Sequence, residues 1–160
     1  MEFHCLADEL TAALGQWSGD TLAVGLFASS EERPEHPLRS QLMTAFGPEL
    51  QQRLEQRRFR AKPGECLSLE RLGATPRSLI LVGLGEPDAF DLDGLRAAAA
   101  SAARAAGGAG AEHLAVALPC KGFVSAAAGR TIAEAVRLSV YSDQRFKSEP
   151  EPTGQPAAVS

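Results

Sequence analysis

The sequence predicts an α/β fold in which helices cover both faces of a largely parallel sheet. Residues 78–84 (S-L-I-L-V-G-L) and 113–119 (H-L-A-V-A-L-P) are apolar on both sides, as expected of strands covered on both faces. Between them, residues 97–106 are almost entirely alanine, which favours a helix that lies close to a sheet. Strands that alternate with helices imply parallel crossovers, and therefore a three-layer α/β/α sandwich.

Composition restricts the classes of protein that fit this chain. A length of 160 residues suits one domain, and 44% apolar with only 6% aromatic residues indicates an aliphatic core. The net charge of -4 comes from mixed charges, which argues against a nucleic-acid partner. No leader and no membrane-length apolar run is visible, so we expect a cytoplasmic protein without a membrane partner.

The first half of the chain predicts one strand and two helices. Residues 21–27 (T-L-A-V-G-L-F) have a buried-strand pattern, and residues 29–37 are polar with two prolines, as in a surface loop. Apolar residues then recur at helical spacing: Leu38, Leu42, Ala45 and Phe46. Pro48 suits the first position of a second helix, with Leu50 and Leu54 on its apolar face.

A weaker strand pattern follows the second helix. In residues 65–72 the apolar Cys66, Leu67 and Leu69 are interspersed with polar residues, which predicts a half-exposed strand. The short apolar stretch 3–6 opens the chain. Residues 157–160 are interpreted as the truncated start of a further strand, whose unpaired edge would favour association.

The remaining helices have recognisable ends. Asp91 or Asp93 can cap the start of the alanine-rich helix, and Gly107 and Gly108 are predicted to end it. Residues 125–141 form the last predicted helix. Its apolar side is made by Ala128, Ile132, Ala135, Val136 and Val140.

The turn Gly83-Leu84-Gly85 follows a buried strand and invites comparison with a dinucleotide-binding fingerprint. That fingerprint needs a third glycine three residues after the second, but position 88 is Asp, and its charge would oppose a pyrophosphate. The turn is therefore interpreted as a tight strand-to-helix connection. The glycines of residues 107–110 follow a helix, the wrong end for a phosphate loop.

The remaining reactive residue types form no catalytic pattern. The cysteines, Cys5, Cys66 and Cys120, are odd in number and far apart, so we expect them to be reduced and structural. The histidines, His4, His36 and His113, have no partner at metal-ligand spacing. No G-x-S-x-G elbow is present. We therefore assign no catalytic, cofactor-binding or metal-binding residue to this chain.

Three sequence blocks occur in a specific order. Residues 59–65 (F-R-A-K-P-G-E) are similar to a pattern F-x-G-K-x-G-E, with Ala61 where glycine is usual. Residues 81–85 (L-V-G-L-G), with the Phe and alanine-rich helix after them, form the second block. Residues 134–147 match E-G-L-x-L-x-x-Y-x-F-D-x-Y-K in outline. Together the blocks resemble the N-terminal domain of the leucyl (cytosol) aminopeptidase family.

The resemblance implies a macro-like domain over residues 1–149, with a mixed, largely parallel sheet, followed by a linker at residues 150–160. It also implies a larger C-terminal catalytic domain, a homohexamer, and removal of N-terminal amino acids from peptides with two zinc or manganese ions. The family's catalytic groups belong to motifs such as N-T-D-A-E-G-R, which does not occur in this sequence. No catalytic residue is carried over, and the chain alone is expected to be inactive.

An alternative from another class is a free-standing, macro-like binding domain. It would hold an ADP-ribose-type ligand with the loops that follow Gly85 and Pro119. Such a site requires phosphate-binding glycine loops and an acidic residue for the adenine, whereas the sequence offers only the Gly83/Gly85 turn.

Overall fold

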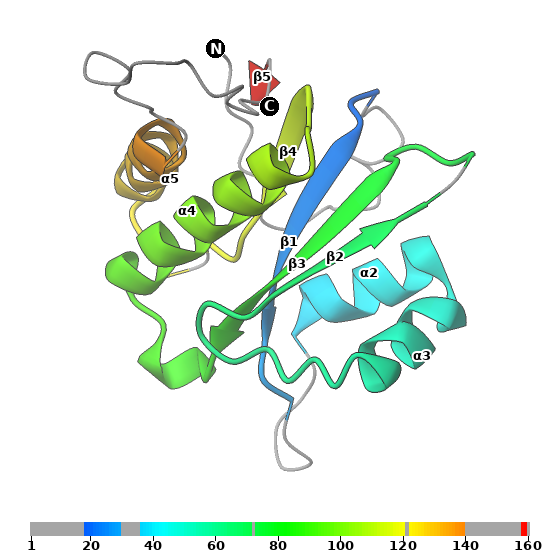
Figure 1. The fold of residues 1–160 in the computed structure, drawn as a ribbon. Helices are drawn as coiled ribbons and strands as arrows, with labels where there is room; N and C mark the ends of the chain where they lie inside the picture. The colour runs from blue at the N-terminus through cyan, green and yellow to red at the C-terminus, as the bar shows by residue number, and fades with distance from the viewer. Residues whose placement is uncertain (1–17, 30–35, 72, 121, 140–157, 160) are drawn as a thin grey trace, which may run out of the picture.

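The computed structural model describes residues 18–29, 36–71, 73–120, 122–139 and 158–159. Helices lie on both faces of one twisted sheet, with α2 and α3 on one side and α4 and α5 on the other (Figure 1). In chain order the elements are β1 (Thr21–Phe27), α2 (Pro37–Phe46), α3 (Pro48–Gln56), β2 (Cys66–Glu70), β3 (Ser78–Gly85), the 3₁₀ helix η1 (Pro87–Ala89), α4 (Leu92–Gly108), β4 (His113–Ala117), α5 (Ser125–Ser139) and β5 (Ala158–Val159).

The sheet has the strand order β2-β3-β1-β4-β5. β1 is parallel to β3 on one side and to β4 on the other, and β5 is parallel to β4. Among the described strands, only β2 is antiparallel to its neighbour, β3. The predicted three-layer α/β sandwich with a mixed, largely parallel sheet is therefore confirmed.

Strands β3 and β4 were predicted, from residues 78–84 and 113–119, to be covered on both faces, and both are buried along almost their whole length. Every residue of β3 is buried, as its continuous apolar run predicted. β1 nevertheless occupies the middle of the sheet, because α4 crosses over it to connect β3 with β4. β5 confirms the strand predicted near residues 157–160. The predicted apolar start at residues 3–6 lies outside the described part.

The sheet separates two hydrophobic cores. On one face, alternate residues of β1 and β3 pack against α2 and α3 through Leu38, Leu42, Leu50 and Leu54. On the other face the sheet meets α4, whose buried side is formed by alanines: Ala98, Ala99, Ala102, Ala103 and Ala106. These small side chains allow a close approach of the helix, and α5 packs against α4 with its own apolar side.

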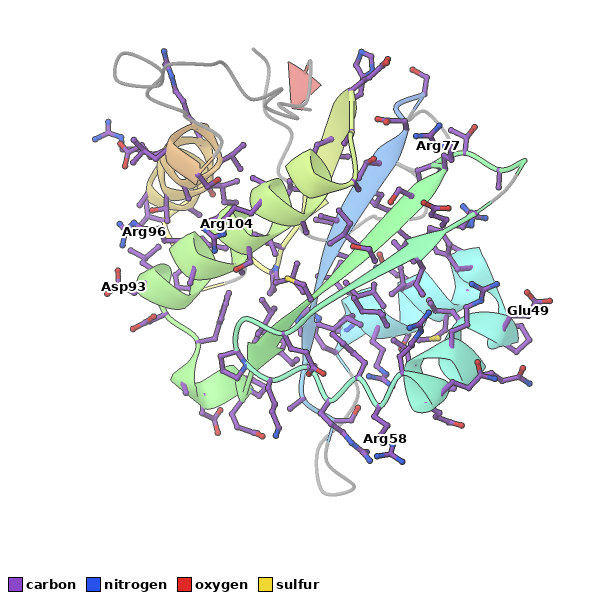
Figure 2. All side chains as sticks on the ribbon, in the orientation of Figure 1. Glu49, Arg58, Arg77, Asp93, Arg96 and Arg104 are labelled. Atoms are coloured by element: carbon purple, nitrogen blue, oxygen red, sulfur yellow. The ribbon has the colours of Figure 1, made fainter. Side chains whose placement is uncertain are left out.

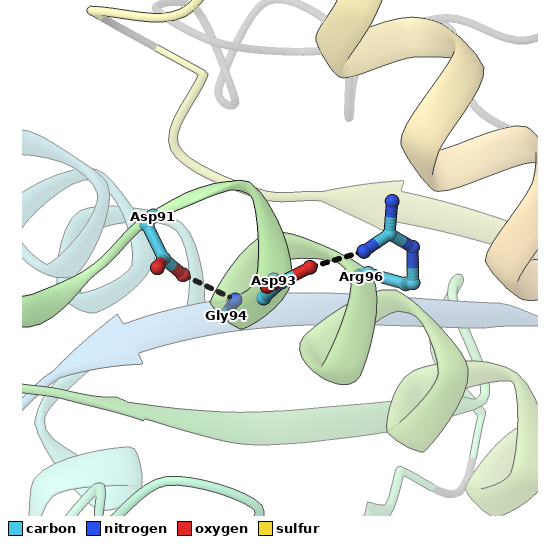
Figure 3. A network of polar contacts seen from close by, with 4 residues as sticks. All are labelled: Asp91, Asp93, Gly94 and Arg96. Atoms are coloured by element: carbon cyan, nitrogen blue, oxygen red, sulfur yellow. Dashed lines mark hydrogen bonds and ion pairs between the residues drawn. The ribbon is translucent and has the colours of Figure 1, made fainter.

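The start of α4 is capped by Asp91, one of the two residues that the sequence offered. Its carboxylate accepts a hydrogen bond of 2.8 Å from the backbone N–H of Gly94 (Figure 3). Asp93 lies in the first turn and forms an exposed ion pair with Arg96. The side chain that precedes the helix therefore satisfies its end, while the next acidic residue complements the helix dipole.

The predicted end of α4 requires a correction. Gly107 and Gly108 lie inside the helix, and the residue in the left-handed region is Gly110, with φ 70°. The N–H of Ala111 donates to the carbonyl of Ala106, and the N–H of Gly110 to that of Gly107. This pair of bonds is a Schellman motif, in which glycine is preferred at the position that follows the cap residue.

The last helix, predicted over residues 125–141, is confirmed from Ser125 to Ser139. Its buried side consists of Ala128, Thr131, Ile132, Ala135 and Val136. Val140, which the prediction also placed on this side, lies outside the described residues. Among the described residues, no helix combines the length and apolar character that crossing a membrane requires.

Candidate functional site

Gly83 and Gly85 of β3 contact the backbone of the loop at residues 61–65. The N–H of Gly85 donates to the carbonyl of Ala61 at 2.8 Å, and the N–H of Gly83 to that of Glu65 at 2.7 Å. The N–H of Gly64 donates in return to the carbonyl of Gly83 at 3.2 Å. The backbone of this loop thus lies directly on the end of β3.

This contact explains why both positions are glycine. A Cβ at Gly83 would lie 2.1 Å from the carbonyl oxygen of Lys62, and one at Gly85 would lie 2.6 Å from Cγ of Pro63. Gly85 also has φ 76°. The two glycines are therefore covered by protein, not open toward a phosphate. The prediction of a structural role was right, but the cause is a loop contact and not only a tight connection to the helix.

The loop is held by its own acidic residue. The carboxylate of Glu65 accepts hydrogen bonds of 3.0 Å from the backbone N–H groups of Arg60 and Lys62. Ala61 between them has φ 55° and is 2% exposed. A left-handed conformation normally favours glycine, which agrees with the glycine usual at this place in the resembled pattern.

The helix before the loop ends in the same motif as α4. The N–H of Phe59 donates to the carbonyl of Leu54, and the N–H of Arg58 donates to that of Glu55, both at 3.0 Å. Phe59 and Leu54 belong to the same apolar cluster, which is the contact expected of a Schellman motif. Here, however, the left-handed position is Arg58, with φ 53°.

Aromatic side chains fill the carboxyl ends of the parallel strands, where α/β proteins usually bind ligands. The ring of Phe90, in the loop after β3, lies 5.2 Å from that of Phe27 at the end of β1. Phe123, in the loop after β4, lies 6.0 Å from Phe90. Phe27 also packs edge-on against His36 at 5.1 Å. The loops proposed for an ADP-ribose-type ligand thus converge on an aromatic cluster.

The histidines and cysteines do not assemble into a reactive group in the described part of the chain. His36 caps α2 by accepting from the N–H of Leu38 at 3.3 Å, and His113 is exposed at the start of β4. The thiol of Cys120 donates to the carbonyl of Leu118 at 3.4 Å. His4 and Cys5 lie outside the described residues. No group of three His, Cys, Asp or Glu side chains that could hold a metal occurs within them.

Cys66 differs from the expectation that the cysteines are packed. It is exposed on the edge strand β2, because its side chain shares the face of Ser68 and Glu70 and not that of the buried Leu69. Partial burial of its thiol raises the pKa above the ordinary 9.0, although the nearby Arg104 opposes this shift. A raised pKa disfavours the nucleophilic thiolate at neutral pH.

One acidic residue joins the amino ends of two strands that are distant in sequence. The carboxylate of Asp20, before β1, accepts from the backbone N–H groups of His113 at 2.8 Å and Glu112 at 3.1 Å. Partial burial raises the pKa of Asp20, but these hydrogen bonds together outweigh that effect, so the pKa falls below the ordinary 3.8. Nothing in the sequence indicated this connection between β1 and β4.

The charged side chains that project from the surface are spread over several elements (Figure 2). Glu49, Arg58 and Arg104, for example, extend from different parts of the fold. Asp93 and Arg96 form a pair that is more than half exposed at both side chains. Such pairs contribute little to stability, and this distribution does not concentrate an acid and a base at one point.

Comparison with known proteins agrees with the motif-based expectation. Residues 23–150 match the family model described as the cytosol aminopeptidase family, N-terminal domain. The chain is 42% identical over 149 residues to a probable cytosol aminopeptidase of Synechococcus sp. (strain CC9605). That match covers 93% of this chain but only 29% of the relative, so the chain spans less than a third of the length of such relatives.

Two solved structures share the fold. A mutant of tomato leucine aminopeptidase matches with a TM-score of 0.72 and 28% identity, over 91% of this chain and 30% of that protein. The macrodomain of Thermus aquaticus DarG matches with a TM-score of 0.60 and 13% identity, over 91% of both chains, which shows a shared fold alone. The chain therefore belongs to the cytosol aminopeptidase family and corresponds to the N-terminal domain of its members.

Proposed function

We propose that the full-length protein is an aminopeptidase that releases N-terminal amino acids, leucine among them, from peptides, and that residues 1–149 are its non-catalytic domain. The observation that carries this proposal is the extent of the match: an N-terminal family model covers residues 23–150, while the relatives are more than three times longer. Residues 150–160 follow as the connection to the catalytic domain in this proposal, although β5 within them still pairs with β4 of this domain. On this proposal, no residue of the 160 takes part in the chemistry.

The metal ions belong to the catalytic domain in this proposal. Two divalent ions, zinc or manganese, would activate a water molecule and polarise the scissile carbonyl. The finding that supports this placement is that the described residues contain no cluster of three potential ligands. No step of the hydrolysis is therefore assigned to a residue of this domain.

The role left to this domain is assembly and regulation of the enzyme. We propose that it packs against its own catalytic domain within a cytoplasmic homohexamer. The pairing of β1 with β3 along its whole length and the two aliphatic cores suit a scaffold. Among the described residues, by contrast, His36 caps α2 and no group of three His, Cys, Asp or Glu side chains comes together.

The experiment is hydrolysis of leucine p-nitroanilide after loading with manganese or zinc. The full-length protein should hydrolyse this substrate, whereas the 160-residue chain at the same concentration should not. A chelator should abolish the activity of the full-length protein. Metal-dependent hydrolysis by the 160-residue chain alone would contradict the assignment of this domain as non-catalytic.

The alternative, a macro-like domain that binds an ADP-ribose-type ligand, is less well supported. Gly83 and Gly85 are covered by the loop at residues 61–65, and Phe27, Phe90 and Phe123 occupy the ends of the neighbouring strands. We expect no increase in melting temperature when ADP-ribose is added, because a ligand stabilises a protein only if it binds the folded state. A concentration-dependent increase would favour the alternative.

A further inference from the structure

The outer edge of β2 carries unpaired backbone groups. Two hydrogen bonds of 2.7 Å to the neighbouring chain segment lie just beyond the ends of β2. The N–H of Gly83 donates to the carbonyl of Glu65, and the N–H of Arg71 donates to the carbonyl of Arg77. Because hydrogen-bonded pairs alternate along an antiparallel ladder, Leu67 and Leu69 also face β3. The backbone groups of the intervening residues, Cys66, Ser68 and Glu70, therefore point outward. In the described part of the sheet, β3 is the single neighbour of β2.

This edge lacks three of the features that usually block edge strands, namely proline, lysine and a bulge, although it is short and carries the charged Glu70. The sequence of β2 is C-L-S-L-E, without proline or lysine, and its pairing with β3 is regular over all five residues. Cys66, Ser68 and Glu70 are exposed, and β2 is the last described strand on this side of the sheet. An open, regular edge of this kind is a template for another strand.

We propose that β2 pairs with β2 of a second copy of this chain, antiparallel about a two-fold axis at Ser68. An axis at Ser68 pairs all five residues of the strand and places outward-facing residues opposite one another. Ser68 then lies opposite Ser68 of the second copy, and Cys66 opposite Glu70. Other registers that keep outward residues opposed pair fewer residues.

The side chains of β2 are self-complementary in this register. On the face that carries α3, Leu67 lies opposite Leu69 of the second copy, which forms two apolar cross-strand pairs related by the axis. At the strand ends Glu65 lies opposite Arg71, but both are already engaged within their own copy. Glu65 accepts from the N–H groups of Arg60 and Lys62, and Arg71 contacts the ring of Phe46, so the pairing does not depend on an ion pair between them. A two-fold interface requires such self-complementarity, because each contact between two different residues occurs twice.

A groove beside β2 extends the proposed contact to α3. Two open hollows of about 390 and 380 Å³ share Glu49 and Arg53 of α3 and Leu69 of β2. Glu49, Gln52, Arg53 and Gln56 are spaced three and four residues apart, so they form one exposed stripe along α3. Figure 2 shows Glu49 extending outward from this side. Because the stripe carries both charges, it can pair with itself across the axis.

Cysteine cross-linking of the full-length protein tests the register directly. Residues in a hydrogen-bonded antiparallel pair have α-carbons about 5.5 Å apart, within the range of a disulfide. The double variant Cys66→Ser/Ser68→Cys should therefore form a covalent dimer on mild oxidation, with the disulfide joining position 68 of both chains. Glu70→Cys, with Cys66 retained, should link positions 66 and 70. Mass spectrometry of the joined peptides identifies the links.

Three controls separate pairing from random collision. The wild type should not link through Cys66, because the two Cys66 α-carbons would lie about 13 Å apart along the strands. Thr44→Cys, on the exposed surface of α2, should remain monomeric on a non-reducing gel. Adding Ser68→Pro to Glu70→Cys removes an outward N–H without affecting the bonds to β3, and should abolish the 66–70 link.

Two outcomes would overturn the proposal. One is that neither cysteine variant forms a dimer although both retain the wild-type circular dichroism spectrum. The other is that Thr44→Cys dimerises as readily as Cys66→Ser/Ser68→Cys, which would show collision and not a specific edge. Because the links are mapped to residues, self-association through other parts of the protein does not affect the result.

Discussion

The carbonyl oxygen of Lys62 lies only 2.1 Å from the point where Gly83 would carry a Cβ atom. The contact joins the loop at residues 61–65 to β3, and three backbone hydrogen bonds surround it. A methyl group at Gly83 cannot be accommodated by rotating a side chain, because the obstructing atoms belong to the backbone. The loop must therefore move away from β3 or the strand must bend.

Gly83→Ala should lower the free energy of unfolding by about 1–3 kcal/mol, the usual cost of overpacking. Urea denaturation followed by circular dichroism measures this change. Gly129→Ala is the matched control, since Gly129 lies within α5 and has open space around its Cβ position. There the same substitution should stabilise the protein by about 0.5–1 kcal/mol. Equal effects at both glycines would contradict the proposed contact.

The ends of α3 and α4 provide a second comparison. Both are Schellman motifs, but the left-handed residue is Gly110 after α4 and Arg58 after α3. A residue with a Cβ is strained in this conformation. Arg58→Gly should therefore raise the free energy of unfolding by about 1 kcal/mol, seen as a higher midpoint of urea denaturation. Gln52→Gly, inside α3, should lower stability by about 1 kcal/mol. A loss of stability in Arg58→Gly would show that its side chain contributes more than its backbone costs.

Glu65 holds the loop through two charge-assisted hydrogen bonds to Arg60 and Lys62. Glu65→Gln removes the charge and replaces one acceptor oxygen by a donor, so we expect a loss of about 1–2 kcal/mol in unfolding free energy. Glu70→Gln, on the exposed face of β2, should change stability by less than about 0.5 kcal/mol. If the two variants are equally stable at neutral pH, the carboxylate of Glu65 does not hold the loop.

Asp20 should make stability depend on pH. Its pKa in the folded state is below 3.8, so the folded state binds a proton less readily than the unfolded state. The ionised carboxylate of Asp20 therefore stabilises the folded state fully above about pH 5. This contribution is lost as the pH falls through 3.8 toward the folded pKa. Asp20→Asn should be less stable than the wild type at pH 7, by about 1 kcal/mol.

The difference in unfolding free energy between the wild type and Asp20→Asn should become smaller at about pH 3, where the Asp20 carboxyl approaches the neutral state of the amide. Denaturation at the two pH values measures it. Asp93→Asn serves as the control, because the exposed pair with Arg96 should contribute less than about 0.5 kcal/mol at either pH. If Asp20→Asn loses the same unfolding free energy at both pH values, its effect comes from packing and not from charge.

Several elements could be predicted from the sequence because their signals are local. The apolar runs of β1, β3 and β4, Pro48 at the start of α3 and the alanine-rich α4 all appear where they were expected. The motif-based family assignment also holds over residues 23–150. These features depend on burial and on backbone propensity, both of which act within a few residues.

One prediction that failed concerns the place of a strand in the sheet, and another concerns which of several neighbouring glycines ends a helix. Cys66 is apolar and lies in a strand, yet it is exposed because β2 is at the edge of the sheet. The end of α4 was expected at Gly107 and Gly108, but both fit within the helix and Gly110 takes the left-handed conformation. Several glycines in sequence cannot indicate which of them will turn.

By itself, the sequence determined the alternation of strands and helices and the family, because hydrophobic periodicity and short motifs are properties of contiguous residues. Only the tertiary structure decided which residues meet. It placed β1 in the centre, joined Asp20 to the start of β4, and set the loop of Lys62 against Gly83. Such contacts connect residues far apart along the chain, so they depend on how the layers pack and have no local signal.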